Sequence, residues 1–361
     1  MALDVLAKVY AGERLDKDDA LALFNSDDLF ELGRAASFVA ERLHGKRVCY
    51  TRNRHINPTN ICVNRCRFCA FSRSHGQDGA YGLTVNEILD KLAGTSSHFN
   101  ELHIVGGLHP DWPFSYYLEL ISKIKQHYPH VQIKAFTAVE IDHFTKLSGL
   151  GLSGTLSELK AHGLDMLPGG GAEIFSETVR ARLCPEKIPA GRWLEIHEAA
   201  HNLGIRTNAT MLYGHIETYE DRVGHLLMLR ELQGRTGGFQ AFIPLSYQPV
   251  TGSAIDVNNY PSGPSGIDDL KTIAVSRLVL DNFPHIKAYW IMLGEKICQL
   301  ALYFGATDID GTVIEEKIAH SAGASSSEML TPDEMVHLIK KAQKEPVERN
   351  AVYEEVPCTA K

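Results

Sequence analysis

Three cysteines stand close together in this chain at the spacing C-x3-C-x2-C. They are Cys62, Cys66 and Cys69, with Phe68 directly before the third. Three thiolates on one loop can bind three corners of a 4Fe–4S cube, whereas clusters that only transfer electrons are ordinarily held by four cysteines. The fourth iron then has an open coordination position and can bind and reduce a substrate. The spacing therefore predicts a cluster that takes part in chemistry.

A zinc site is the alternative for these cysteines. Structural zinc needs a closed set of four ligands, and His75 is the one nearby candidate for the fourth. Zinc ribbons pair two C-x2-C hooks, which this segment lacks. The pattern therefore favours the iron–sulfur cluster. We interpret the cysteines outside the motif as ordinary thiols: Cys49, Cys184, Cys298 and Cys358.

The composition is that of an ordinary globular protein, with 361 residues, 44% hydrophobic, 22% charged and a net charge of −8. No Lys/Arg-rich run occurs, which argues against nucleic acid as the main partner. No apolar run approaches the roughly 18 residues of a membrane span, and residues 1–24 contain no apolar signal segment. Seven cysteines without a secretory context argue against a disulfide framework. We therefore expect a cytoplasmic protein, in a reducing compartment that suits an oxygen-sensitive cluster.

Short apolar strands alternate with amphipathic helices from residue 47 onward, which predicts an α/β fold. Residues 1–46 indicate a helical extension, 47–345 a barrel domain and 346–361 a charged tail. The expected strands are 48–57, 101–106, 132–139, 165–168, 206–213, 239–246, 286–293 and 306–313. The expected helices are 85–93, 114–127, 141–162, 192–203, 219–233, 268–282, 295–304 and, at the C-terminus, 332–343. Such repeats imply parallel strands with right-handed crossovers, so we expect a (β/α)8 TIM-type barrel, with an open six-strand partial barrel as the alternative.

Barrel active sites lie at the C-terminal ends of the strands. The cysteine loop follows the first expected strand, and Gly106-Gly107 follows the second. Glu173 comes after the fourth strand, Tyr213 closes the fifth, and a long loop over 249–266 follows the sixth. These segments should therefore meet at one end of the barrel.

The cysteine segment resembles the signature of the radical S-adenosylmethionine (SAM) enzymes. The resemblance implies that the open iron chelates the methionine part of SAM and that one electron cleaves its C5′–S bond. The products are methionine and a 5′-deoxyadenosyl radical. In this family Phe68 would shield the cluster. Gly106 and Gly107, which lack Cβ atoms, would let the backbone approach the ammonium group of SAM.

The resemblance also implies further SAM-binding residues. Glu173 and Arg192 resemble the acid and arginine that other family barrels place around SAM, with Arg180 and Arg182 as competitors for the arginine. Tyr213 and Tyr247 would line the adenine, or else pack in the core. Glu140 would bind the ribose hydroxyls or the adenine, and its alternative is a helix-start acid.

Four short segments of the sequence resemble one branch of this family. They are His55 to Cys62, Cys69 to Arg73, Ala135 to Ile141 and Ile318 to Ala324. The branch contains the aminofutalosine synthases, the cyclic dehypoxanthine futalosine synthases and the two halves of F0 synthase. The four segments are most similar to those of the aminofutalosine synthases. That similarity implies radical addition to 3-[(1-carboxyvinyl)oxy]benzoate, then rearrangement and decarboxylation, giving 6-amino-6-deoxyfutalosine for menaquinone. A flavodoxin or ferredoxin would be the reductant.

Such a substrate carries two carboxylates, which need cationic partners. Arg73, just past the cluster loop, and His320, in a late loop, are the preferred pair. The other candidates at strand ends are Arg54, His55, His109 and Lys287. Two alternatives stay open: a sister enzyme of the same branch that abstracts hydrogen, and a non-catalytic iron–sulfur or zinc protein.

Overall fold

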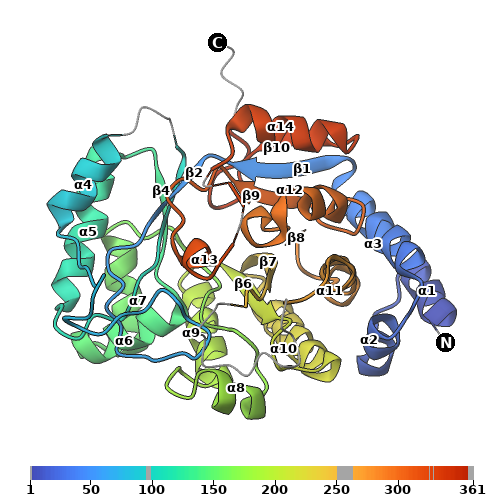
Figure 1. Cartoon of the computed structure of the whole chain (residues 1–361), viewed down its shortest axis with the longest axis horizontal. Coiled ribbons are helices and arrows are strands. Elements are labelled where there is room, and N and C mark those ends of the chain that lie inside the picture. Colours follow the sequence, from blue (N-terminus) through green and yellow to red (C-terminus); the bar gives the residue numbers. More distant parts are fainter. Residues whose placement is uncertain (1, 95–98, 250–262, 325, 328, 357–361) are drawn as a thin grey trace.

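The computed structural model describes residues 2–94, 99–249, 263–324, 326–327 and 329–356 (Figure 1). Of the loop expected at 249–266, residues 250–262 lie outside the described residues, as does Cys358. The centre of the molecule is a seven-stranded parallel sheet whose strands follow one another in chain order. Its strands are β2 (Asn53–Ile56), β3 (Glu101–Ile104), β4 (Gln132–Ala135), β5 (Met166–Leu167), β6 (Arg206–Tyr213), β7 (Phe239–Ser246) and β8 (His285–Ile286).

Helices surround this curled sheet (Figure 1). They are α1 (Ala2–Ala11), α2 (Lys17–Phe24), α3 (Leu29–His44), α4 (Val85–Ala93), α5 (Phe114–His127), α6 (Ala138–Ser148), α7 (Gly151–Ala161), α8 (Glu177–Leu183), α9 (Ala190–Asn202), α10 (Tyr219–Thr236), α11 (Gly266–Val279), α12 (Trp290–Ala301), α13 (Ile318–Ser321) and α14 (Pro332–Lys341). The predicted TIM-type α/β fold is confirmed, in the form of a partial barrel. Helices α1 to α3 form the predicted N-terminal extension, with α2 and α3 packed against α11.

The eight-strand version of the barrel is wrong because two expected strands belong partly to a second sheet. In this sheet β1 (Arg47–Thr51) lies between β10 (Glu345–Glu348) and β9 (Asp308–Gly311), and all pairs are parallel. The strand expected at 48–57 is therefore divided into β1 and β2. Single bridges, Lys287 with Asp308 and Arg54 with Ile314, link the β9 segment to the two edges of the seven-stranded sheet.

The buried Asn53 side chain explains where the first strand divides. Its Oδ1 accepts a hydrogen bond from the backbone N–H of Val313 at 2.7 Å, and the backbone N–H of Asn53 donates to Oγ1 of Thr312 at 3.1 Å. A Cβ on Gly311 would overlap this Asn53 side chain. The chain thus passes from one sheet to the other through bonds to a segment about 260 residues later.

Local signals account for most helix boundaries. Thr84 and Thr331 each accept from the backbone N–H three residues on and begin α4 and α14 with complete capping boxes. The helix expected at 141–162 is two helices, because Gly149 and Gly151 adopt positive φ angles of 68° and 70° between them. Among the described residues, no helix has the length and apolar character needed to cross a membrane.

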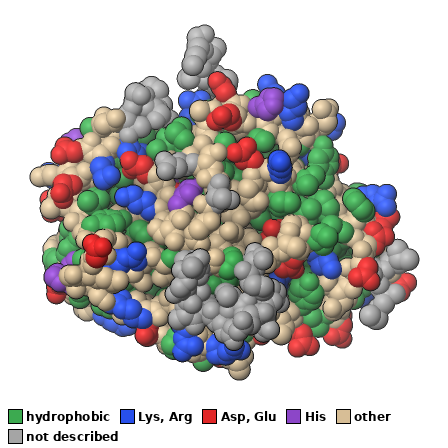
Figure 2. Space-filling model, in the orientation of Figure 1, with side chains coloured by type: hydrophobic (Ala, Val, Ile, Leu, Met, Phe, Trp, Pro, Cys, Tyr) green, Lys and Arg blue, Asp and Glu red, His purple; other side chains and the backbone are tan. Residues whose placement is uncertain are grey.

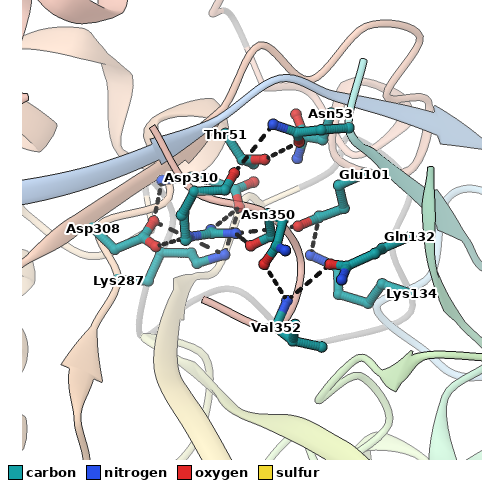
Figure 3. Close-up of polar contacts among 12 residues, drawn as sticks. Thr51, Asn53, Glu101, Gln132, Lys134, Lys287, Asp308, Asp310, Asn350 and Val352 are labelled. Carbon is teal, nitrogen blue, oxygen red and sulfur yellow. Dashed lines mark hydrogen bonds and ion pairs between the residues drawn. The ribbon is translucent and has the colours of Figure 1, made fainter. Parts of the chain in front are cut away.

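Acidic and basic side chains are interspersed on the face drawn in Figure 2 rather than gathered into a patch of one sign. Inside the barrel, by contrast, charges are concentrated. Six buried charged side chains meet where the two sheets approach each other: Glu101, Lys134, Lys287, Asp308, Asp310 and Arg349. Figure 3 labels the two lysines and the three acids. Arg349 donates to Asp308 at 2.6 Å and to Glu101 at 3.2 Å, and Lys287 donates to Asp310 at 2.6 Å.

Part of the segment expected as a charged tail, 346–361, belongs to this network and to the second sheet. Residues 345–348 form β10, and Arg349 is 1% exposed. With three cations and three anions, the network is neutral overall. It joins the C-terminal segment to the floor of the barrel through charge-assisted hydrogen bonds.

We expect acid to destabilise the protein through this network. Burial alone would raise the pKa of the carboxyl groups of Glu101, Asp308 and Asp310, but the neighbouring lysine and arginine charges lower each pKa below its ordinary value. A folded-state pKa below the unfolded value stabilises the protein at higher pH, and this stability is lost as the pH falls. Urea midpoints should therefore drop steeply below about pH 4.5. A constant midpoint between pH 5 and pH 3 would contradict this expectation.

Candidate active site

One cavity of about 320 Å³ opens inside the curled sheet. The three motif cysteines, Gly106 and Gly107 line it where the strands end, and Lys134 and Lys287 line it nearer the charged network. The prediction that the cysteine loop and the Gly-Gly turn meet at one site is therefore confirmed. Phe68, Glu140 and Glu173 also line the cavity.

Backbone hydrogen bonds fix the cysteine loop to its surroundings. The N–H of Cys62 donates to the carbonyl of Arg73 at 3.1 Å, and that of Val63 donates to Leu108 at 3.1 Å. The N–H of Cys69 donates to the carbonyl of Cys66 at 3.0 Å and closes a tight turn. All three cysteines are free thiols and partly exposed.

The three motif cysteines are the predicted ligands of the cluster. Among the described residues, no group of three or more His, Cys, Asp or Glu side chains is placed to hold one metal ion. A cube distributes its three thiolate ligands over separate irons, so they need not converge on one point. Burial raises the pKa of the Cys66 thiol to about 12. Iron binding would therefore have to displace the Cys66 proton, as it does for any thiolate ligand.

The Gly-Gly turn touches the cysteine loop directly. The N–H of Gly107 donates to the carbonyl of Thr59 at 2.9 Å. A Cβ built on Gly107 would overlap the carbonyl oxygen of Ile61, and one on Gly106 would lie 3.1 Å from the carbonyl oxygen of Thr59. The two glycines are therefore needed because their backbone packs closely against the backbone of the segment that leads into the cysteine loop. This requirement exists whether or not a ligand also approaches them.

We expect Gly107→Ala to lower stability by about 1–3 kcal/mol, because its methyl group must displace the backbone of the cysteine loop. The same displacement should lower the iron content after cluster reconstitution. Gly224→Ala is the matched control, since a Cβ on Gly224 in α10 meets nothing within 4 Å. Thermal unfolding and iron analysis measure both effects. Equal stability and iron content in the two variants would contradict the steric argument.

Glu140 lines the cavity but its carboxylate already has partners. Its Oε2 accepts from the N–H and the hydroxyl of Thr137, at 2.7 and 2.8 Å, and its Oε1 accepts from the N–H of Gly106 at 3.1 Å. Burial raises the pKa of Glu140 to about 7. This residue caps α6 and ties it to the Gly-Gly turn, which is the helix-start alternative that the sequence left open.

Glu173 forms an ion pair with Lys187, not with Arg192. Both partners line the cavity, Glu173 has a φ of +48°, and the Lys187 ammonium lies 5.1 Å from the centre of the Phe68 ring. Arg192 is absent from the cavity wall. It donates to Asp142 at 2.8 Å, so the structure does not support the expected SAM-binding role of Arg192.

The two competitor arginines do not take its place. Arg180 is buried and donates to the carbonyls of Ala172 at 2.6 Å and Ile174 at 3.1 Å, and it also bonds to the carbonyl of Ile188. Arg180 therefore shapes the loop that carries Glu173. Arg182 is exposed and does not line the cavity.

Tyr213 is a core residue. It is fully buried, its hydroxyl donates to Asp269 at 2.6 Å, and it does not line the cavity. Its neighbours along β6, Thr210 and Leu212, do line the cavity, as does Tyr247 after β7. The strand ends were predicted correctly, but the side chain that faces inward was not, because alternate residues of a strand point to opposite faces.

Arg73 and His320 lie together in a second hollow beside the main cavity. The Arg73 guanidinium donates to the carbonyls of Ala70 and Ser72 at 2.8 and 2.9 Å, so it supports its own loop. Nδ1 of His320 is 2.8 Å from the carbonyl oxygen of Glu316. Neither side chain lines the main cavity, so the structure does not support the predicted direct catalytic roles.

Comparison with known proteins identifies the family. Residues 56–229 match the model of the radical SAM superfamily, and residues 236–361 match that of the CofH/MqnC C-terminal region. The chain is 46% identical to the aminodeoxyfutalosine synthase of Thermus thermophilus, over 98% of this chain and 95% of that protein. The chain belongs to the radical SAM superfamily. It is a radical SAM enzyme with a transferase-type reaction.

Two further comparisons bear on this radical SAM enzyme. It is 40% identical to the 5-amino-6-(D-ribitylamino)uracil–L-tyrosine 4-hydroxyphenyl transferase of Methanopyrus kandleri, over 99% of this chain and 97% of that protein. The crystal structure of methylornithine synthase superimposes with a TM-score of 0.75 at 19% identity, covering 95% of this chain and 97% of that chain. This last likeness concerns the fold alone.

Membership of the family implies a 4Fe–4S cluster and SAM. The residues present fit both groups, since three free thiols line a cavity whose wall also contains Gly106, Gly107 and the Glu173–Lys187 ion pair. Sequence reasoning missed Lys187 and Lys134. A lysine inside the buried strand β4 was a usable signal for Lys134, whereas Lys187 lies in an irregular turn without any pattern.

Proposed function

We propose that this enzyme joins the 5′-deoxyadenosyl group to 3-[(1-carboxyvinyl)oxy]benzoate and gives 6-amino-6-deoxyfutalosine in menaquinone biosynthesis. The observation that carries the proposal is the 46% identity with an aminodeoxyfutalosine synthase along almost the whole of both chains. The cavity supports it, because cluster cysteines and buried lysines line the same space. A flavodoxin or ferredoxin is the proposed reductant.

The cluster, with SAM bound and one electron supplied, provides a 5′-deoxyadenosyl radical. The chain must then protect and direct this radical. Leu212, Leu245 and Met292 line the cavity and offer an apolar wall that excludes water. Positioning of the alkene beside C5′ supplies the selectivity for addition. The overall reaction joins SAM and the enol ether, releases methionine and carbon dioxide, and returns the electron, without net consumption of water.

Lys187 is the proposed partner of the SAM carboxylate in place of Arg192. We expect Lys187→Met to weaken SAM binding about 10-fold, the size of one lost charge-assisted hydrogen bond. Arg192→Met is the control and should change the SAM dissociation constant less than about 2-fold, because Arg192 bonds to Asp142 outside the cavity. Calorimetry on the cluster-loaded enzyme measures both. A larger effect of Arg192→Met would restore the role first expected for it.

A second candidate function follows from the 40% identity with the tyrosine 4-hydroxyphenyl transferase. That relative's name describes transfer from tyrosine to a pyrimidine, without incorporation of the adenosyl group. The two functions therefore differ in whether the 5′-deoxyadenosyl group becomes part of the product.

One anaerobic experiment separates them. The reconstituted, reduced enzyme receives SAM labelled in the adenosyl group and either the aryl enol ether or tyrosine with 5-amino-6-(D-ribitylamino)uracil. Label in the product of the enol ether supports the proposal. Free 5′-deoxyadenosine formed in step with tyrosine turnover would overturn it.

A further inference from the structure

We propose that Lys134, Lys287 and His55 form an anion subsite at the inner end of the cavity, which binds the aromatic carboxylate of the substrate. The identity of this ligand rests on the proposed function. The subsite itself rests on three observations. Two buried lysines line the cavity, a buried nitrogen of His55 has no hydrogen-bond partner among the described residues, and His55 and Lys134 lie in strands, whereas the cysteine loop lies beyond the strand ends.

The two lysines are unusual because they are buried and yet line a cavity. Lys134 is 3% exposed and Lys287 is 1% exposed. Each ammonium group has three N–H donors. Among the described residues, the hydrogen bonds recorded are one from Lys134 to Glu101 and one from Lys287 to Asp310. Both ammonium groups therefore keep donor capacity for a ligand in the cavity that they share.

His55 supplies the independent sign of a missing ligand. The residue is 7% exposed and lines the cavity, and its buried Nε2 has no hydrogen-bond partner among the described residues. Its ring stacks on that of His103, with centroids 4.6 Å apart and planes inclined by 10°, which fixes its orientation. A buried polar atom without a partner is unfavourable, so a ligand oxygen at this point would stabilise the site.

The acids of the cavity wall already have partners. Asp310 is already paired with Lys287, Glu173 with Lys187, and Glu140 with the backbone of its helix. Glu316 accepts from the backbone N–H groups of α13. Since the buried network is neutral overall, an arriving carboxylate meets two ammonium groups without an unpaired acid facing it.

The subsite lies further back along the strands than the cysteine loop. His55 and Lys134 lie within strands, while the Gly-Gly turn and the cysteine loop lie beyond the strand ends. His103, stacked on His55, precedes Gly106 by three residues, or about 10 Å at the ordinary rise of a strand. An aromatic carboxylate held at the inner end would leave the enol ether directed toward the open iron. The site would thereby select a substrate that is anionic at its far end.

The test measures binding separately from turnover. Calorimetry on the cluster-loaded enzyme with SAM compares 3-hydroxybenzoate with 3-hydroxybenzamide, which has nearly the same shape without the charge. We expect the acid to bind at least about 10-fold more tightly. His55→Gln and Lys287→Gln should each reduce this preference to less than about 3-fold. Lys146→Gln, at a side chain 74% exposed, should leave it unchanged.

The outcomes distinguish the subsite from the function. Equal binding of acid and amide to the wild type would overturn the subsite, even if the enol ether is converted to the adenosyl product. A preference for the acid that the variants lose, without any such product, would support the subsite and overturn the proposed function. If Lys287→Gln fails to fold, as judged by circular dichroism, His55→Gln decides, and a preference retained there overturns the role of His55 and the proposal.

Discussion

Replacing Cys66 with alanine is expected to abolish cluster binding and SAM cleavage while the barrel still folds. Two remaining thiolates cannot hold a cube whose fourth iron must stay open. The change should have little effect on stability, because Cys66 packs only at the margin of a small apolar cluster with Leu183, Leu212 and Tyr247. Iron analysis, formation of 5′-deoxyadenosine and thermal unfolding test the three parts of this expectation.

Cys184→Ala is the matched control for this variant. Cys184 is 1% exposed and belongs to the same apolar cluster, but it stands outside the motif and does not line the cavity. We expect Cys184→Ala to keep its iron and its SAM cleavage. Full iron content in Cys66→Ala, or loss of iron in both variants to the same degree, would contradict the assignment of the three motif cysteines.

The helices next to the site could be predicted because their signals are local. The expected helices 85–93 and 114–127 match α4 and α5 in both bounds. In α4, Thr84 and Glu87 form a capping box that is visible in the sequence. The short helix α8 was missed, since its seven residues are below the length at which a helical period can be recognised.

The division of the first strand could not be predicted, because its cause is distant in the chain. Residues 48–57 were expected to form one strand, and the polar run around Asn53 contains no Gly or Pro that would end it. The interruption arises from hydrogen bonds between Asn53 and the segment at Thr312 and Val313. Contacts of such sequence separation leave no periodic signal. The same reason hid the pairing of β10 with β1.

In the site, short residues on loops that directly follow a strand were predicted better than residues with long side chains on helices. Cys62 and Gly107 line the cavity because the order of strands and loops carries them there. Arg192 was expected in the cavity because Glu173 and Arg192 resemble the acid and arginine that other family barrels place around SAM. A spacing of nineteen residues crosses a helix, a turn and another helix, so it does not determine which face of α9 the arginine occupies. Lys187, in the intervening turn, takes the position beside Glu173.

The second large effect is expected from Arg349→Met, which should destabilise the protein by about 3–5 kcal/mol. Arg349 is buried, and its guanidinium bonds to Asp308 at 2.6 Å and to Glu101 at 3.2 Å. Methionine retains much of the volume but leaves two buried carboxylates with one cationic partner fewer. Urea unfolding at pH 7 measures the loss, provided that the transition is two-state.

Arg47→Met is the control, because Arg47 also bonds to an acid of the C-terminal segment but on the surface. Its ion pair with Glu355 joins side chains that are 45% and 62% exposed, so its removal should change stability by less than about 1 kcal/mol. If Arg349→Met were as stable as Arg47→Met, the C-terminal segment would be a dispensable tail after all. If the expected difference is found, the segment is part of the barrel floor. Because Lys134 and Lys287 belong to the same network, Arg349→Met should then also weaken the preference of the cavity for a carboxylate.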